Sequence, residues 1–213
     1  MNKCIICDKT LEDTFHSLLG EVNKVCYSCF KSFKIRNECF YISGVKGYVL
    51  YYYDDFFKDL LYRYKGLKDY VLKDAFISYN LNKLKRKYKG YKIVLAPSSE
   101  NSELERGFCH LEEIFKVMGL AIIKCFKKTK EWKQSDKNLI ERRKIQNIIK
   151  IDKAQLNGVK KILIVDDVLT TGSTIKAMIS QIPSNISIKV LVLSSNCRFL
   201  VNEIGSKKYE NNN

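Results

Sequence analysis

Short apolar runs separate longer amphipathic stretches along most of this chain. A short run of β-branched, aromatic and leucine residues that ends at Gly, Pro or charged residues predicts a buried strand. Such runs occur at residues 47–53, 92–96, 120–126, 161–165 and 188–193. We therefore expect these five segments to form the strands of a sheet.

Between the strands, apolar residues recur three, four and seven positions apart, as on one face of an α-helix. The clearest case runs from residue 69 to 88, with Tyr70, Ile77, Leu81, Leu84 and Tyr88 on one face. Further helices are predicted over residues 54–64, 108–118 and 173–181, whereas residues 127–147 are polar with little periodicity. This alternation predicts an α/β fold, with a mainly parallel sheet flanked by helices.

Length and composition agree with that fold. The chain has 213 residues, 46% of them hydrophobic, which is enough for one medium domain with its own core and a small appendage. The longest apolar runs are about five residues, far short of the ~18 that cross a membrane. No secretory signal is visible at the N-terminus, so we expect a cytoplasmic protein without a transmembrane segment.

The net charge of the chain indicates a class of binding partner. Thirty-eight Lys and Arg against 23 Asp and Glu give a net charge of +15, and 12 of these 15 charges lie between residues 41 and 160. An excess of this size indicates a polyanionic or phosphate-bearing partner.

The cysteines are concentrated at the N-terminus, with five of the eight in the first 39 residues. The pairs Cys4-x-x-Cys7 and Cys26-x-x-Cys29 have the spacing with which a zinc ribbon offers four thiolates to Zn²⁺. A redox pair would need only one such motif, and two matched pairs are improbable by chance. We predict a small zinc-binding module over residues 1–42 and a main domain over residues 43–213.

Two other residues lie close to these pairs in the sequence. His16 and Cys39 are each able to replace a ligand or to complete a second site. The simpler interpretation, a surface histidine and a small buried thiol, is favoured for both.

The most informative segment runs from Ile162 to Thr174. It joins an apolar strand to the carboxylates of Asp166 and Asp167, and then to a loop of small and hydroxyl residues, Thr170, Thr171, Gly172, Ser173 and Thr174. Such a loop offers backbone N–H groups and hydroxyls to a phosphate. Adjacent carboxylates suit ribose hydroxyls or a hydrated Mg²⁺. A phosphorylated sugar satisfies both halves of the segment.

Other phosphate loops fit less well. A Walker loop needs Gly-Lys-Ser/Thr, and a dinucleotide-binding loop needs Gly-x-Gly-x-x-Gly. Neither pattern is present in this segment. A receiver-like aspartate pocket does not account for the Thr-Thr-Gly-Ser-Thr sequence, and a purely structural turn does not need all these residue types together.

The same segment resembles the phosphoribosyl pyrophosphate (PRPP) signature of type I phosphoribosyltransferases, and with the cysteine module the chain resembles the ComF family of competence proteins. Tyr64-Lys65-Gly66 with Asp69, Leu95-Ala96-Pro97-Ser98 and Arg106-Gly107-Phe108 are similar to further family segments. So is the run that contains Gln134-Ser135, Leu139, Arg142, Arg143 and Asn147. Cys109-His110 replaces the family's usual Asn-Gln.

The resemblance implies a type I phosphoribosyltransferase-like domain that binds Mg²⁺ with PRPP. Asp166 and Asp167 would hold the ribose and Thr170 to Thr174 the 5-phosphate. Pro97, Ser98 and Ser99 would meet the pyrophosphate, and Arg143, from a mobile loop, would stabilise the leaving group. Whether transfer occurs is open, and the acceptor, a nucleobase or a nucleic-acid-related group, is not specified by the sequence.

The resemblance also implies a role in natural transformation, with incoming single-stranded DNA as partner, beside the competence DNA-translocating ATPase at the inner face of the cell membrane. Aromatic residues alternate with cations at Tyr62-Arg63-Tyr64-Lys65 and Lys87-Tyr88-Lys89, a pattern that suits stacked bases and a phosphate backbone. The alternative is that these tyrosines face the core. The predicted nucleic-acid contacts are Arg63, Lys65, Lys85, Arg86, Lys87 and Lys89.

Overall fold

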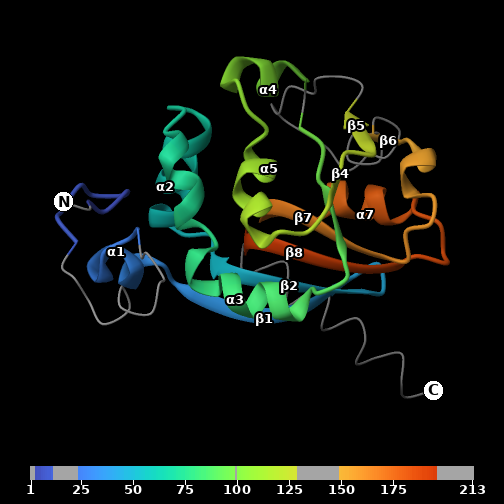
Figure 1. Ribbon diagram of the computed structural model, residues 1–213, viewed down its shortest axis with the longest axis horizontal. Coiled ribbons are helices and arrows are strands. Elements are labelled where there is room, and N and C mark those ends of the chain that lie inside the picture. The colour runs from blue at the N-terminus through green and yellow to red at the C-terminus, as the bar shows by residue number, and fades with distance from the viewer. Residues whose placement is uncertain (1–2, 12–23, 99, 129–148, 196–213) are drawn as a thin grey trace.

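The computed structural model in Figure 1 describes residues 3–11, 24–98, 100–128 and 149–195. A six-stranded sheet has the order β1-β2-β8-β7-β3-β4, and β5 and β6 form a separate two-stranded sheet. The strands are β1 (Ile35–Ile42), β2 (Val45–Tyr52), β3 (Lys92–Leu95), β4 (Ile122–Ile123), β5 (Phe126–Lys128), β6 (Ile149–Ile151), β7 (Lys161–Leu169) and β8 (Ser187–Ser195). In the large sheet only the β1–β2 pair is antiparallel. The predicted mainly parallel α/β fold is confirmed.

Helices connect these strands. The α-helices are α1 (Tyr27–Ser32), α2 (Asp55–Lys65), α3 (Leu81–Lys87), α4 (Glu100–Arg106), α5 (His110–Phe115) and α7 (Ser173–Ile179). Short 3₁₀ turns are η2 (Tyr70–Ala75), η3 (Ser78–Asn80), η4 (Lys116–Met118) and η5 (Lys153–Leu156). The crossovers from β2 to β3 and from β3 to β4 run in one direction across the sheet, and the crossover from β7 to β8 runs in the other. Right-handed connections therefore place α2, α3 and α5 on one face and α7 on the other.

The central strands form the core. Ile162 to Val165 of β7 and Val190 to Leu193 of β8 are fully buried, as expected for parallel strands covered on both faces. At the edge, the ring of Phe40 lies over Gly47, where a Cβ would meet it at 2.3 Å. Only glycine fits at this position of β2.

Helix α2 shows how sequence sets local structure. The carboxylate of Asp54 accepts a hydrogen bond from the backbone N–H of Phe57 (3.0 Å) and caps the helix. Phe57, Leu60, Leu61 and Tyr64 follow the three-and-four spacing and are buried. The last turn presents Lys65 beyond this apolar face, which decides where its amine can reach.

Two sequence predictions are wrong, and one strand was not predicted. The single helix over residues 69–88 is wrong, because η2, η3 and the shorter α3 occupy this segment and Tyr70 is exposed. The strand over residues 120–126 is divided between β4 and β5, which lie in different sheets. The strand that was not predicted is β1, which lies within residues 1–42 and yet pairs with β2 in the main sheet. That residues 1–42 form a separate module stays a prediction.

The N-terminal segment packs firmly on the main domain. The rings of Phe30 and Tyr79 stack with centroids 3.7 Å apart, and the Lys24 amine lies 2.6 Å from the Asp74 carboxylate. Phe33 is buried in the shared core. In the described parts of the chain, no helix is long and apolar enough to span a membrane.

Candidate ribose-phosphate site and cysteine cluster

The two adjacent carboxylates lie at the carboxyl end of the sheet. β7 continues through Asp166 and Asp167 to Leu169, four residues beyond the predicted strand. The loop that follows brings Gly172 to a φ of 70° before α7 begins at Ser173. Since this left-handed conformation strains a side-chain-bearing residue, glycine is the residue expected here.

The loop presents hydroxyls near the chain reversal. Thr170 and Thr171 are exposed, and Ser173 and Thr174 are half-buried at the start of α7. The hydroxyl oxygens of Thr171 and Ser173 lie 2.5 Å apart. The predicted phosphate-binding residues are therefore adjacent in space and accessible to a small anion.

Asp167 is held as an anion by two side chains from other elements. The Lys65 amine donates to Oδ2 at 2.6 Å, and Nε2 of His110 lies 3.0 Å from the same oxygen. The backbone N–H of Val168 donates to Oδ1 at 2.7 Å. Burial alone would raise the pKa of Asp167, but the charge of Lys65 and the contact with His110 outweigh it and hold this pKa well below its usual range.

The neighbouring Asp166 has the opposite character. Burial, and then the charge of Asp167, raise its pKa to about 8. At neutral pH it is mostly protonated, so it can both donate and accept hydrogen bonds. The two carboxylates that the sequence presents as equivalent are one anion and one neutral acid.

His110 is the buried link to α5. Burial lowers the pKa of His110, which favours the neutral ring, and Asp167 opposes this effect. A neutral ring that donates from Nε2 to Asp167 keeps Nδ1 as an acceptor, and Nδ1 is buried without a partner in the described structure. Tyr64 donates from its hydroxyl to the backbone carbonyl of His110 (2.9 Å), which joins α2 to α5 beside Asp167.

The segment that follows β3 lies next to β7, close to the two carboxylates. β3 pairs with β7 in parallel, with Leu95 opposite Val165, and the backbone N–H of Ala96 donates to the carbonyl of Val165 (3.0 Å). Pro97 and Ser98 follow directly and are half-buried. The structure thus places two of the predicted pyrophosphate residues beside Asp166. Ser99 and Arg143 lie outside the described residues.

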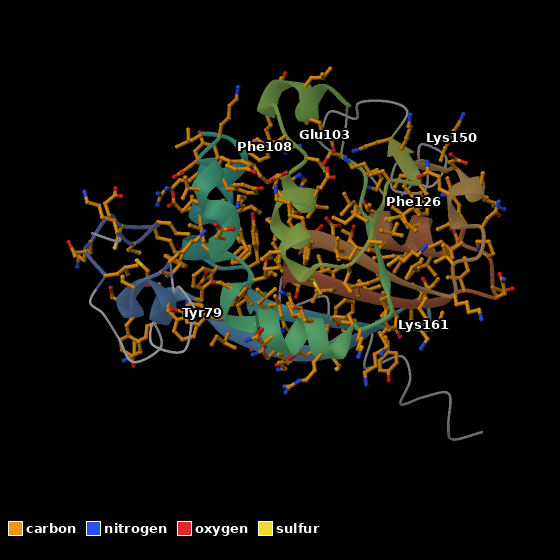
Figure 2. All side chains as sticks on the ribbon, viewed as in Figure 1. Tyr79, Glu103, Phe108, Phe126, Lys150 and Lys161 are labelled. Atoms are coloured by element: carbon orange, nitrogen blue, oxygen red, sulfur yellow. The ribbon has the colours of Figure 1, made fainter. Side chains whose placement is uncertain are left out.

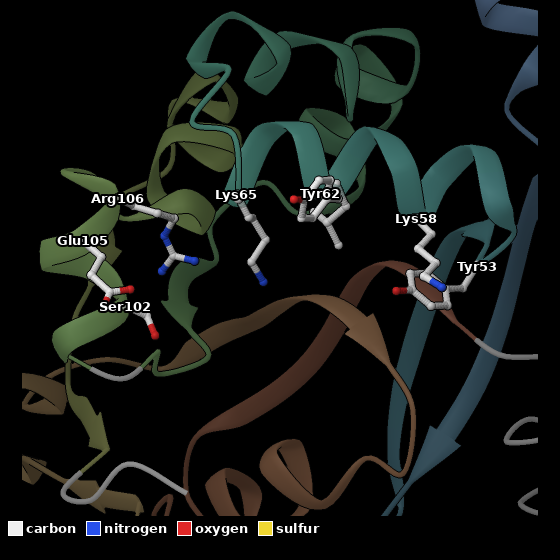
Figure 3. Close-up of a pocket in the computed structure, with 9 residues that line it drawn as sticks. Tyr53, Lys58, Tyr62, Lys65, Ser102, Glu105 and Arg106 are labelled. Carbon is white, nitrogen blue, oxygen red and sulfur yellow. The ribbon is translucent and has the colours of Figure 1, made fainter. Parts of the chain in front are cut away.

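An open cleft of about 440 Å³ lies between α2 and α4, next to Lys65 (Figure 3). Its lining includes Lys58, Lys65 and Arg106, the carboxylate of Glu105 and the rings of Tyr53 and Tyr62. The Nε and Nη2 atoms of Arg106 are buried without a hydrogen-bond partner in the described structure. A guanidinium in this state favours an anionic or carbonyl-bearing ligand in the cleft.

The predicted nucleic-acid cations divide into two groups. Lys65 is bound to Asp167, and Arg63 donates to the carbonyl of Ile6 (3.0 Å) and to Asp69 (3.2 Å), so both already have partners. Lys85, Arg86 and Lys89 are exposed, whereas Lys87 packs on Tyr48.

The interleaved tyrosines also differ from one another. Tyr64 and Tyr88 are buried, as the alternative interpretation expected, and Tyr62 is 61% exposed. Of these three rings, only that of Tyr62 is open to a stacked base.

The four N-terminal cysteines form a cluster. Sγ atoms of Cys4, Cys7, Cys26 and Cys29 all lie within 4.8 Å of one another, and those of Cys7 and Cys26 are 3.7 Å apart. A tetrahedral zinc with Zn–S bonds of about 2.3 Å needs sulfur atoms roughly 3.8 Å apart. The backbone N–H of Cys26 donates to Sγ of Cys4 (3.3 Å). The donor set and geometry fit one metal ion.

Cys39, the fifth cysteine of the first 39 residues, does not belong to this cluster. Cys39 lies in β1 opposite Tyr48 and is exposed, and His16 lies outside the described residues. The buried thiol expected for Cys39 is wrong.

Two residues of the ribose-phosphate site and its neighbouring cleft, His110 and Arg106, were not assigned a role from the sequence. Their signal was the segment from Arg106 to His110, which resembles the family only in part.

Comparison with known proteins gives a clear relative. No family model matches the chain. The chain is 32% identical over 179 residues to competence protein ComFC of Streptococcus pneumoniae, covering 81% of this chain and 77% of that protein.

The comparison with solved structures finds low similarity to phosphoribosyltransferases. They include a hypoxanthine phosphoribosyltransferase from Staphylococcus aureus (14% identity, TM-score 0.36, covering 67% of this chain and 66% of that chain). Another is adenine phosphoribosyltransferase from Saccharomyces cerevisiae (16%, 0.39, covering 81% and 90%). Because the chain is 32% identical to the pneumococcal protein and the match covers most of both chains, the chain belongs to the ComFC family of competence proteins.

Proposed function

We propose that this chain acts in natural transformation, binding incoming single-stranded DNA in the cytoplasm and carrying a PRPP-type ribose-phosphate site. The competence relative supports the biological role. The net charge of +15 supports a nucleic-acid partner. The competence DNA-translocating ATPase, at the inner face of the membrane, is the protein partner we expect.

One observation carries the ribose-phosphate site. The Asp167 anion, fixed by Lys65 and His110, lies directly before a hydroxyl-rich loop and beside Pro97-Ser98. Residues distant in sequence thus meet at the carboxyl end of parallel strands, where ligands bind in open α/β sheets. An anion held in this way costs burial energy, which a purely structural turn does not require.

Each group has a task in this proposal. Asp166, as a neutral acid, and Asp167 would bind the ribose hydroxyls, and Thr170 to Thr174 would bind the 5-phosphate. Pro97, Ser98 and Ser99 would line the pyrophosphate. Mg²⁺, when bound, would neutralise the charge of the pyrophosphate, and Arg143 would add a cation there. Zn²⁺ is the metal we propose for the four thiolates, with a structural role.

Calorimetric titration of PRPP, with and without Mg²⁺, tests the site. The wild type should bind only with Mg²⁺. The double variant Asp166→Asn/Asp167→Asn should bind at least about tenfold more weakly, since a hydrogen bond from the ligand to the charged Asp167 contributes about 1.5–3 kcal/mol. Asp59→Asn, an exposed carboxylate of α2, is the matched control and should bind as the wild type does. A wild type that does not bind PRPP would overturn the site.

A second function, phosphoribosyl transfer to an acceptor, is favoured by the cleft between α2 and α4. The unpartnered nitrogens of Arg106 and the ring of Tyr62 suit a planar acceptor with a carbonyl or acidic group beside the ribose. Pyrophosphate release from Mg²⁺-PRPP, measured with a panel of nucleobases and single-stranded oligonucleotides, tests it. Release that Arg106→Met abolishes while PRPP binding persists would support transfer. Without release for any acceptor on the panel, binding alone would stand.

A further inference from the structure

Five lysines gather at the amino end of the parallel sheet, opposite to the end that carries Asp167. We call this group the lysine face, and it consists of Lys46, Lys83, Lys87, Lys161 and Lys189. Gly47 of β2 lies opposite Val190 of β8, so Lys46 and Lys189, one residue earlier in each strand, are neighbours. Figure 2 shows Lys161 at the far end of the molecule from Tyr79, on which the cysteine module packs.

Two tyrosine rings each hold two of these amines. The Lys87 amine lies 3.2 Å from the ring centroid of Tyr48, and the Lys83 amine donates to the Tyr48 hydroxyl (2.8 Å). The amines of Lys161 and Lys189 lie 5.9 and 5.3 Å from the centroid of Tyr91. The lysine face is therefore a built surface with two aromatic anchors, not a set of scattered side chains.

Among the residues that the structure describes, no carboxylate neutralises this group. In the described parts of the chain, none of the five amines lies within ion-pair distance of an Asp or Glu, whereas Lys24, Arg63 and Lys65 on the other side are all paired. Burial lowers the pKa of Lys87, and the nearby charges of Lys83, Lys189 and Lys46 lower it further, although Cys39 opposes them. Like charges held this close are stabilised when a polyanion binds.

We propose that the lysine face is the surface that holds the backbone of single-stranded nucleic acid. Its amines suit successive phosphates, and the half-buried Tyr91 and the exposed Tyr41, which lies opposite Lys46 in the β1–β2 hairpin, offer rings to bases. This inference rests on the single-stranded DNA binding proposed above. It assigns that binding to residues outside the Arg63–Lys65 segment.

The position separates the two ligands. Lys161 and Asp167 point to the same face of the sheet, because they are six residues apart on one strand, and they lie roughly 20 Å apart along it. Nucleotides on the lysine face are then too far from the ribose site to act as acceptors. Nucleic acid and PRPP should bind at the same time.

Fluorescence anisotropy with a labelled oligothymidine of about 20 nucleotides, over a range of salt concentrations, tests this assignment. The lysine-face variant is Lys83→Gln/Lys161→Gln/Lys189→Gln. The control is Lys9→Gln/Lys31→Gln/Lys68→Gln, which removes the same charge from exposed lysines near the other end. Thermal unfolding confirms that both are folded.

We expect the lysine-face variant to bind at least about tenfold more weakly, with a log–log salt slope shallower by about 2, because three phosphate contacts are lost. The control should change affinity less than about threefold. Equal losses in both variants would overturn the location, as would displacement of the oligonucleotide by Mg²⁺-PRPP.

Two further results separate the location from the proposed function. If the wild type binds no oligonucleotide, the nucleic-acid function itself fails. If the lysine face instead governs binding to vesicles of phosphatidylglycerol while the oligonucleotide binds both variants equally, the surface is a membrane contact and the inference is wrong.

Discussion

The two ends of the parallel sheet use lysine in opposite ways. At the carboxyl end, the amine of Lys65 is bound to a buried carboxylate and helps to fix it. At the amino end, the amines of Lys161 and Lys189 lie over a tyrosine ring, and no described carboxylate is within ion-pair distance. Paired cations shape a small, specific site, whereas unpaired cations create a surface potential. A net charge of +15 alone cannot distinguish these uses.

The largest expected effect comes from the cysteine cluster, which lies outside both ends of the sheet comparison and tests whether the lysine face depends on it. Cys26→Ser should lose the metal and lower the free energy of unfolding by on the order of 5 kcal/mol, because metal binding supplies folding energy to so small a segment. Elemental analysis and denaturant titration measure both. The lysine face should keep its reactivity toward acylating reagents.

Cys39→Ser is the control, because Cys39 lies outside the cluster. It should keep about one metal ion per chain and wild-type stability. A Cys26→Ser protein that keeps its metal and its stability would contradict the four-thiolate assignment.

The next largest effect is expected when one lysine from each end of the sheet is replaced and the two variants are compared. Lys65→Met removes one partner of a partly buried ion pair and should destabilise the fold by about 2–4 kcal/mol. Lys46→Met, an exposed lysine of the other end, should change stability by less than about 0.5 kcal/mol. Equal effects in denaturant titrations would erase the contrast between the two ends.

The same pair of variants gives a pH test. The pKa of Asp167 is lowered in the folded protein, so its contribution is present above the unfolded pKa of about 4 and is lost as the pH falls further. The gap between wild type and Lys65→Met should therefore narrow below about pH 4. A gap that stays constant with pH would mean that Lys65 stabilises by packing and not by charge.

The smallest effect concerns His110. His110→Leu removes a donor to Asp167 and should cost about 1–2 kcal/mol, whereas His110→Gln keeps an amide donor and should recover most of it. Denaturant titration gives the stabilities, and PRPP titration shows whether the carboxylate stays in place. If Leu and Gln behave alike, the contact with Asp167 contributes nothing beyond volume.

Much of this architecture follows from local sequence. Residues 92–96, 161–165 and 188–193 are strands because runs of buried apolar residues need cover on both faces. β1 was not predicted because its first half, with Arg36, Asn37 and Glu38, lacks an apolar run. The pairing of β1 with β2 is also irregular at that point. The helix over residues 69–88 failed because its periodicity persists through two 3₁₀ turns.

The site shows a different limit. Asp166, Asp167 and the hydroxyl loop are contiguous, so the sequence displays them together. The partners of Asp167 are 102 and 57 residues away in the chain, and only the fold brings them to one oxygen. The low pKa of Asp167 depends on those partners, and the raised pKa of Asp166 depends mainly on burial, so neither shift can be read from sequence spacing.

One topological feature, the place of β8, bears on how the protein folds. β8 lies between β2 and β7 in the sheet order, although β2 precedes it by more than 130 residues. The β1–β2 hairpin therefore joins the rest of the sheet only after β8, more than 130 residues further along, has been synthesised. Pairing between strands so distant in sequence makes folding slow. During translation, the edge of β2 that pairs with β8 therefore stays unpaired until β8 has emerged.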